Sequence, residues 1–252
     1  MSSGKVIHLK NVVKKYGGRT VCDIEDKVLG ECGIEGLIGP NGAGKTTLIN
    51  LISKKTSLTE GQISFFKDDE EIDISKSSLD KLARIGLVRS NQIIQDFESL
   101  TIMDSLLLSL APSKQERFYK LFGDKKARKM AEEEIAWYLD YFHFNDPYGH
   151  ADSAGEKKLL DVIRCMMLKP KYVLMDEPTA GLPEDQTQKA IELMKKKTQE
   201  EGMKILIVEH DLELIWEVCE KIHFMSEGKI MVQGTPEEIK CNEMVHNKYI
   251  GE

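Results

Sequence analysis

The sequence lacks any long hydrophobic run, which argues against an integral membrane protein. No window of its 252 residues approaches the roughly 18–20 uninterrupted apolar residues that a membrane-spanning helix needs. The first residues, Met1-Ser2-Ser3-Gly4-Lys5, also lack the apolar core of a secretory signal. Since 41% of the residues are hydrophobic, the chain can still bury a sizeable core. We therefore expect a soluble globular protein.

Cysteine pairs and an excess of basic charge are also missing. The five cysteines never occur as C-x-x-C, so neither a zinc site nor a disulfide framework is indicated. Reduced thiols in the cytosol are expected instead. The chain carries 35 basic and 42 acidic residues, which gives a net charge of −7. Because nucleic-acid affinity comes mainly from Lys and Arg contacts with phosphates, we expect no nucleic-acid partner.

The hydrophobic pattern alternates between the periods of strands and helices. Short β-like runs fill residues 5–38, and another covers 62–66. The apolar spacing is mostly helical from 101 to 168, and strands alternate with helices after Pro170. This order predicts an α/β fold with a mostly parallel sheet. We expect a single domain over 5–250, with a catalytic core at 5–90 and 170–235, a helical subdomain at about 93–168 and a helical tail at 236–252.

A glycine-rich segment between a predicted strand and a predicted helix matches the pattern G-x-x-x-x-G-K-[ST] in full. Its glycines let successive backbone N–H groups turn toward phosphate oxygens, and the following helix adds its positive N-terminal end. Lys45 is placed for the β- and γ-phosphates, and the Thr46 hydroxyl for Mg²⁺. We therefore expect the chain to bind ATP and Mg²⁺. The candidate nucleotide-binding residues here are Gly39, Pro40, Asn41, Gly42, Ala43, Gly44, Lys45, Thr46 and Thr47.

Two acids follow the apolar run from Tyr172 to Met175, which is typical of a buried parallel strand. Ligands in open parallel sheets bind at the carboxyl ends of strands, so we expect Asp176 beside Thr46, where it would hold Mg²⁺. Glu177 points differently and is expected to polarise the water that attacks the γ-phosphate. An acid pair of this kind is often structural when it stands alone, but after a phosphate-binding loop it indicates ATP hydrolysis.

These motifs resemble those of the ATP-binding-cassette (ABC) ATPases along nearly the whole chain. Residues 176–182, Asp-Glu-Pro-Thr-Ala-Gly-Leu, resemble the D-E-P-T-S-A-L segment of that family, and 208–211, Val-Glu-His-Asp, resemble its switch-histidine segment. Residues 152–157, Asp-Ser-Ala-Gly-Glu-Lys, stand where the family carries its L-S-G-G-Q signature. The resemblance implies a P-loop NTPase fold of the ABC type. In that fold a mostly parallel core sheet is joined by an antiparallel β subdomain and an inserted helical subdomain.

The resemblance also implies roles for single residues. His210 would contact the γ-phosphate, Tyr16 would stack on adenine, and Gln92 would reach the metal and link to the helical subdomain. Three signature residues would face the nucleotide of a second cassette chain: Ser153, Gly155 and Glu156. The candidate catalytic residues are thus Glu177, His210, Lys45 and Gln92, and the candidate metal ligands are Thr46, Gln92 and Asp176. A histidine or tyrosine at such a place is often structural by itself, but the order of the motifs supports these assignments.

Three local features resemble the cytoplasmic subunits of branched-chain amino-acid importers. They are the segments 86–92, 180–182 and 249–252, the last of which, Tyr-Ile-Gly-Glu, lipopolysaccharide-export ATPases share. The resemblance implies a transport-coupled ATPase, peripheral on the inner face of the cell membrane. Its partners would be integral-membrane permease subunits and a second ABC ATPase chain. Two alternatives stay open: a soluble cassette ATPase of the iron–sulfur assembly type, whose signature resembles 153–158, and a weakly catalytic nucleotide-binding regulator.

Several positions depart from the family pattern. Asp152 and Ala154 replace the apolar residue and the first glycine of the signature. A carboxylate about 4 Å from a phosphate charge costs roughly 1–4 kcal/mol, depending on the effective dielectric constant. Asn91 replaces an aromatic residue, Pro183 replaces an Asp, and Glu35 puts a charge that needs a partner into a predicted buried strand. We expect an ATP site that is competent and a signature that is weakened.

Overall fold

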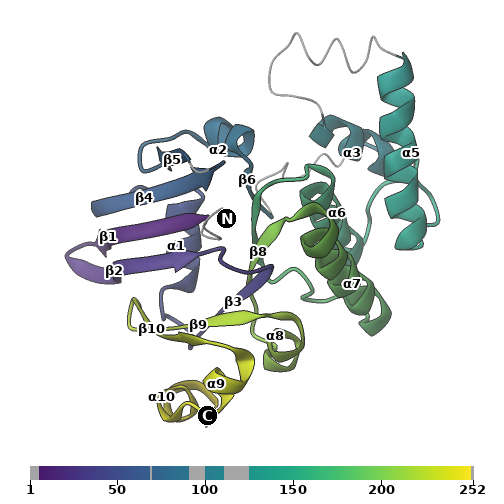
Figure 1. The fold of residues 1–252 in the computed structure, drawn as a ribbon. Coiled ribbons are helices and arrows are strands. Elements are labelled where there is room, and N and C mark those ends of the chain that lie inside the picture. Colours follow the sequence, from purple (N-terminus) through teal and green to yellow (C-terminus); the bar gives the residue numbers. More distant parts are fainter. Residues whose placement is uncertain (1–5, 69, 91–99, 111–124, 251–252) are drawn as a thin grey trace. The chain divides into compact units, whose positions relative to one another are not determined.

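The computed structural model describes residues 6–68, 70–90, 100–110 and 125–250. These residues form two compact units (Figure 1). The first, here called the sheet unit, comprises residues 1–88, 170–177 and 195–252. The second, the helical unit, comprises 89–169 and 178–194, so it includes a segment beyond the insert expected at about 93–168. One contact that links this segment to the rest of the unit is the hydrogen bond from the Tyr141 hydroxyl to the carbonyl oxygen of Lys189, 3.2 Å long.

An antiparallel sheet with the strand order β2-β1-β4-β5 forms one part of the sheet unit. Gly17 and Gly18 both have positive φ, 53° and 85°, and together they make the tight turn between β1 and β2. The β-like runs expected in this region are therefore strands, and they form the expected antiparallel subdomain. The strands are β1 (Ile7–Tyr16), β2 (Arg19–Leu29), β4 (Glu60–Lys67) and β5 (Glu70–Asp73).

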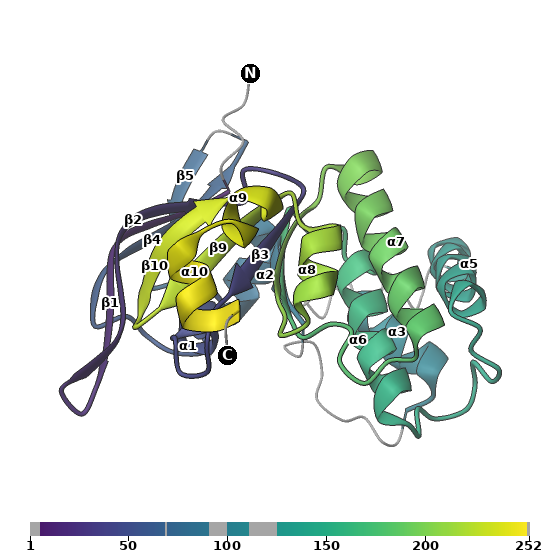
Figure 2. The same cartoon turned by 90° about the horizontal axis from the view of Figure 1, so that it is seen from below.

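The second sheet has the order β10-β9-β3-β8-β7-β6. The pairs β9–β3, β3–β8 and β8–β7 are parallel, and β10 pairs with β9 in the antiparallel sense. Every residue of β3 is buried, as expected for a parallel strand that is covered on both faces. The predicted mostly parallel core sheet is therefore present (Figure 2). Its strands are β3 (Ile34–Ile38), β6 (Leu87–Arg89), β7 (Tyr172–Asp176), β8 (Lys204–Val208), β9 (Lys221–Ser226) and β10 (Lys229–Gly234).

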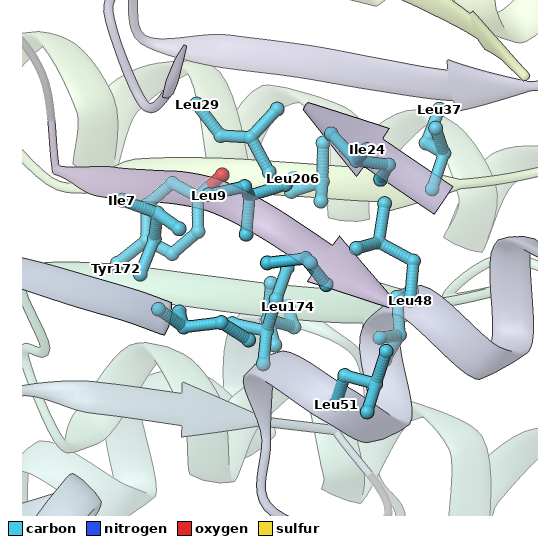
Figure 3. Packing of buried hydrophobic residues seen from close by; sticks show 14 of the residues in the cluster. Ile7, Leu9, Ile24, Leu29, Leu37, Leu48, Leu51, Tyr172, Leu174 and Leu206 are labelled. Atoms are coloured by element: carbon cyan, nitrogen blue, oxygen red, sulfur yellow. The ribbon is translucent and has the colours of Figure 1, made fainter. Parts of the chain in front are cut away.

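A hydrophobic cluster joins both sheets to helix α1 (Lys45–Ile52). Figure 3 shows Leu9 of the antiparallel sheet, Leu174 and Leu206 of the parallel sheet, and Leu48 and Leu51 of α1, all with no exposed surface. Burying a side chain of this size contributes about 1.5–3 kcal/mol. Because α1 starts directly after the glycine-rich loop, this packing holds the end of the loop against both sheets.

The remaining helices are divided between the sheet unit and the helical unit. In the helical unit, Leu106 of α3 and Ile135 and Leu139 of α5 are buried on the apolar stripes that the spacing predicts. No helix in the part of the chain that the structure describes is both long and apolar enough to cross a membrane. The helices are α2 (Leu79–Ile85), α3 (Ile102–Leu110), α5 (Lys125–Tyr141), α6 (Ala154–Met167), α7 (Glu184–Glu201), α8 (Leu212–Val218), α9 (Pro236–Lys240), α10 (Glu243–Val245) and the π-helix η1 (His246–Ile250).

Candidate functional site

A cavity of about 370 Å³ opens in the sheet unit at the carboxyl ends of β7 and β8. The glycine-rich loop closes one side of it. Parallel strands end at the same edge of a sheet, which is why residues far apart in the sequence meet here. The lining residues are Arg19, Val21, Asn41, Gly42, Ala43, Gly44, Lys45, Thr46, Thr47, Asp176, Glu177, Val208 and His210.

The glycine-rich loop lies tightly against the turn between β9 and β10. Gly39 has φ of 148°, and a Cβ atom there would lie 2.0 Å from the carbonyl oxygen of Met225, so no other residue fits. Gly44 has φ of 106° and lies close to the backbone of β2. The N–H of Gly228 donates to the carbonyl oxygen of Ala43 over 2.9 Å. These contacts hold one side of the loop backbone against β2, β9 and the β9–β10 turn. The other side of the loop faces the cavity.

Lys45 is buried inside the loop, with 7% of its surface exposed. Its Nζ donates to the carbonyl oxygens of Gly39 at 2.5 Å and Pro40 at 3.2 Å. Burial lowers the pKa of Lys45, while the charges of Asp176 and Glu177 oppose this shift. A phosphate oxygen entering the cavity would offer the ammonium a charged acceptor in place of neutral carbonyls, which strengthens the hydrogen bond.

Glu177 and His210 form a pair beside the loop. The Glu177 Oε1 lies 3.3 Å from His210 Nε2, and about half of each side chain is exposed. Glu177 has φ of 50°, a rare left-handed value for a residue with a side chain, and its N–H donates to the carbonyl oxygen of Val208 over 2.8 Å. Strain of this kind often occurs at functional sites. The arrangement leaves a carboxylate and an imidazole side by side on the cavity wall.

The Thr46 hydroxyl and the Asp176 carboxylate line the same cavity and offer oxygen ligands. Within the described ranges no group of three or more His, Cys, Asp or Glu side chains is arranged to hold a metal ion. Mg²⁺ typically takes one or two oxygen ligands from the protein and fills its octahedron with water and substrate phosphates. These two residues therefore fit an ion that arrives with a nucleotide.

Arg19 and Val21 of β2 were not anticipated from the sequence. Arg19 pairs across the hairpin with Tyr16, the residue expected to stack on adenine. Tyr16 does not line the cavity, although 50% of its surface is exposed, and Lys14 Nζ lies 4.7 Å from its ring centroid. The Gly-Gly pair at 17–18 could have predicted the position of Arg19. A tight hairpin turn places the residue after the turn directly beside the residue before it, which here is Tyr16.

The signature residues belong to the helical unit, at the start of α6. Ser153 is the N-cap residue, and its Oγ accepts a hydrogen bond from the N–H of Glu156 over 3.0 Å. Glu156 Oε2 in turn accepts from the N–H groups of Asp152 and Ser153, at 3.1 Å each. This reciprocal capping box explains an acid at position 156. Gly155 has room for a side chain, since a Cβ atom there would lie 3.7 Å from its nearest neighbour, Cδ2 of Leu182.

Gln92, expected to reach the metal, and Asn91 beside it lie outside the described residues, as do the last two residues, 251–252. The proposed contacts of Gln92 therefore stay predictions.

Comparisons with known proteins agree with this architecture. A family model described as ABC transporter matches residues 29–180. A probable branched-chain amino acid transport ATP-binding protein of Archaeoglobus fulgidus is 31% identical over 98% of this chain and 96% of its own length. A lipopolysaccharide export system ATP-binding protein of Haemophilus influenzae is 30% identical over 98% of each chain.

Solved structures give the same result. A nucleotide-free ATP-binding cassette from an ABC transporter superposes with a TM-score of 0.78 and 28% identity, covering 98% of this chain and 100% of that one. The ADP conformation of another such cassette gives a TM-score of 0.77 and 27% identity, covering 98% and 99%. The expected fold and the expected resemblance are both confirmed: the chain belongs to the ABC transporter family and is one of its ATPase cassettes.

Proposed function

We propose that this chain binds Mg-ATP in the cavity and hydrolyses it to power the transport of branched-chain amino acids or a related small solute. One observation carries the proposal: Lys45, Thr46, Asp176, Glu177 and His210 all line the same cavity. The solute class rests on the relatives, among them the branched-chain amino acid transport protein of Archaeoglobus fulgidus.

The phosphate groups would lie on the loop from 39 to 47, where Lys45 and the N-terminus of α1 supply positive charge. Thr46 and Asp176 would hold Mg²⁺, which would neutralise part of the phosphate charge. Glu177 would accept a hydrogen bond from the attacking water and orient it toward the γ-phosphate. His210, 3.3 Å from Glu177, would hold that carboxylate in place and contact the γ-phosphate itself.

The second half of the site would come from another cassette chain. Ser153, Gly155 and Glu156 of that chain would close over the γ-phosphate, and Tyr16 of this chain would stack on adenine. Integral-membrane permease subunits would receive the opening and closing of the pair through the region of Gln92. In this arrangement the chain is cytoplasmic and peripheral on the inner face of the cell membrane.

The signature that this chain offers to a partner would be weak. Asp152 adds a negative charge and Ala154 a methyl group where the family has neither, whereas the cavity residues match the family pattern. Slow turnover of the isolated chain follows, or a heterodimer in which the partner supplies the better signature. A rate of tens of turnovers per second for the purified chain alone would exclude this weakening.

The test of the main proposal compares the wild type with Lys45→Ala in nucleotide binding and phosphate release. We expect the wild type to bind Mg-ATP and the variant to bind it much more weakly, because the variant loses a buried ammonium from the loop. Equal affinities would overturn the assignment of the cavity. Purification with the native partners then distinguishes the two candidate functions. A transporter subunit should co-purify with a polytopic membrane protein, whereas an ATPase of iron–sulfur assembly should co-purify with a soluble scaffold protein.

A further inference from the structure

The turn between β9 and β10 forms hydrogen bonds with both the phosphate-binding loop and β2. Its two residues, Glu227 and Gly228, have φ values of 52° and 80°, the left-handed geometry of a two-residue hairpin turn. The N–H of Gly228 donates to the carbonyl oxygen of Ala43 over 2.9 Å. The carbonyl oxygen of Gly228 accepts from the N–H of Asp23 over 2.8 Å. The backbone of one glycine therefore connects the loop to β2.

The loop and β2 supply different parts of the cavity lining. The loop contributes residues 41–47, and β2 contributes Arg19 and Val21. The two segments also meet directly, since a Cβ atom on Gly44 would lie 2.7 Å from the carbonyl oxygen of Val21. Figures 1 and 2 show β10 beside β2. The hydrogen bonds of the turn thus set how far apart these two parts of the lining lie.

Position 228 has little room for a side chain. A Cβ atom there would lie 3.0 Å from the carbonyl oxygen of Val21 and 3.3 Å from Cα of Cys22. Backbone atoms of a paired strand cannot rotate away as the end of a flexible side chain can, so the strand or the turn has to move. The positive φ of Gly228 adds backbone strain for any other residue. A side chain at this position therefore changes the separation between β2 and the loop.

We propose that Gly228 is a positioning residue for nucleotide binding, whose backbone holds β2 and the loop at the separation that lets one nucleotide contact both. The inference rests on the proposed ATP site and names what sets its width. A ligand that reaches only the loop, such as inorganic tripolyphosphate, depends on this separation less than ATP does, because it makes no contact with β2.

The direct test is Gly228→Ala. We expect the Kd for the fluorescent nucleotide mant-ATP to rise about three- to tenfold, the effect of losing about one hydrogen bond. Tripolyphosphate, measured by its displacement of mant-ATP, should lose much less affinity. The KM for ATP should rise while kcat stays near the wild-type value, since Glu177 and His210 follow β7 and β8 and do not contact the turn. An equal loss for both ligands would overturn the role of the β2 separation.

The matched control is Gly202→Ala, between α7 and β8. Gly202 has φ of 66°, and a Cβ atom there would meet nothing within 4 Å. This variant carries the same kind of backbone strain but displaces no neighbour. Its thermal midpoint should fall about as far as that of Gly228→Ala, while its affinity for mant-ATP stays at the wild-type value. Equal losses of affinity in the two variants would mean general destabilisation and would overturn the inference.

Hydrogen exchange of the wild type gives a second, independent measurement. Coupling is reciprocal, so a bridge that strengthens nucleotide binding must be held more tightly when nucleotide is bound. Saturation with ATP should slow exchange of the Asp23 and Gly228 amides, the two donors of the bridge. The slowing should exceed that of the Ile205 amide, which donates to the carbonyl oxygen of Gly33 over 2.9 Å at the amino end of β8.

The outcomes separate this inference from the proposed function. Equal slowing at Asp23, Gly228 and Ile205 would overturn the inference even if Gly228→Ala failed to fold. Wild-type affinity of Gly228→Ala for mant-ATP would overturn it and leave the proposed function standing. A wild-type chain that bound no nucleotide would overturn both.

Discussion

The carboxylate of Glu35 in β3 lies 3.1 Å from Nε2 of His223 in β9, and both side chains are fully buried. The same carboxylate accepts hydrogen bonds from the N–H groups of Gly30 and Glu31, at 2.8 Å each. Burial alone would raise the pKa of Glu35, but the hydrogen bond and charge of His223 and the two N–H groups outweigh it and hold this pKa below its ordinary value. The buried Glu35 carboxylate, which the sequence analysis expected to need a partner, is therefore paired with His223 on the neighbouring strand.

Replacing Glu35 by Gln should destabilise the fold. The variant loses the negative charge beside His223, and its amide offers one acceptor oxygen where the carboxylate offers two, so its NH2 group faces a buried donor. Removing one partner of a buried pair typically costs about 3–5 kcal/mol. Urea unfolding at pH 7 would measure the loss, with Glu25→Gln on the exposed face of β2 as the control. A variant as stable as the wild type would contradict a structural role for the pair.

The lowered pKa of Glu35 also predicts an acid-dependent loss of stability. A carboxyl whose pKa is lower in the folded state than in the unfolded state stabilises the fold fully above the unfolded value. That stabilisation disappears as the pH falls from the ordinary value of 4.5 through the lowered folded value. Urea unfolding measured between pH 7 and pH 3 should therefore show a steeper decline for the wild type than for Glu35→Gln. Parallel curves would mean that the Glu35 pKa is not shifted.

Replacing Glu177 by Gln should preserve ATP binding and stop turnover. The amide keeps the size of the side chain but cannot take a proton from the attacking water, and general-base catalysis is typically worth about 10²–10⁴-fold. Steady-state phosphate release should fall by at least about 100-fold, while the Kd for mant-ATP stays within error. Closed dimers should accumulate on gel filtration with ATP.

The control for this variant is Glu213→Gln, an exposed acid at the start of α8. It should hydrolyse ATP at the wild-type rate. Normal hydrolysis by Glu177→Gln itself would remove Glu177 as the general base.

Replacing Arg19 by Ala should weaken nucleotide binding without stopping chemistry. Arg19 lines the cavity together with Lys45 and adds a positive charge to its wall. Because the side chain is exposed, the effect should be modest, about three- to fivefold in Kd, and smaller at high salt. Titration with mant-ATP at two salt concentrations measures it. Lys55→Ala, which removes one exposed charge at a residue outside the cavity lining, should show no such loss.

Replacing Ala154 by Gly should raise turnover if the signature limits it. The change removes a methyl group at the first residue of α6, next to the Ser153 cap. If closure of the dimer became easier by about 1 kcal/mol, kcat would rise roughly fivefold. Phosphate release by the isolated chain is the measurement. Ala136→Gly, the same change at an exposed position of α5, should leave the rate unaltered; a rise in both variants would point to a general loosening of helices instead.

Much of the fold follows from local pattern. The strand ending in Asp176 and the helix starting at Lys45 lie where the apolar periodicity places them, because buried strands and amphipathic helices impose different spacings on the same residue types. The residue range of the helical unit could not be predicted from this periodicity. Residues 178–194 join it through contacts such as Tyr141 with Lys189, which are 48 positions apart in the sequence.

The sequence by itself determined the phosphate-binding loop, the acid pair and the order of motifs that marks the family, since each is a short run whose chemistry depends on neighbouring residues. Only the tertiary structure decided which distant groups complete them. It brought Arg19 to the cavity and His223 to Glu35. The physical reason is that these contacts depend on the order of the strands in each sheet and on the path of the connections between them. The local spacing of residues along the sequence does not determine either one.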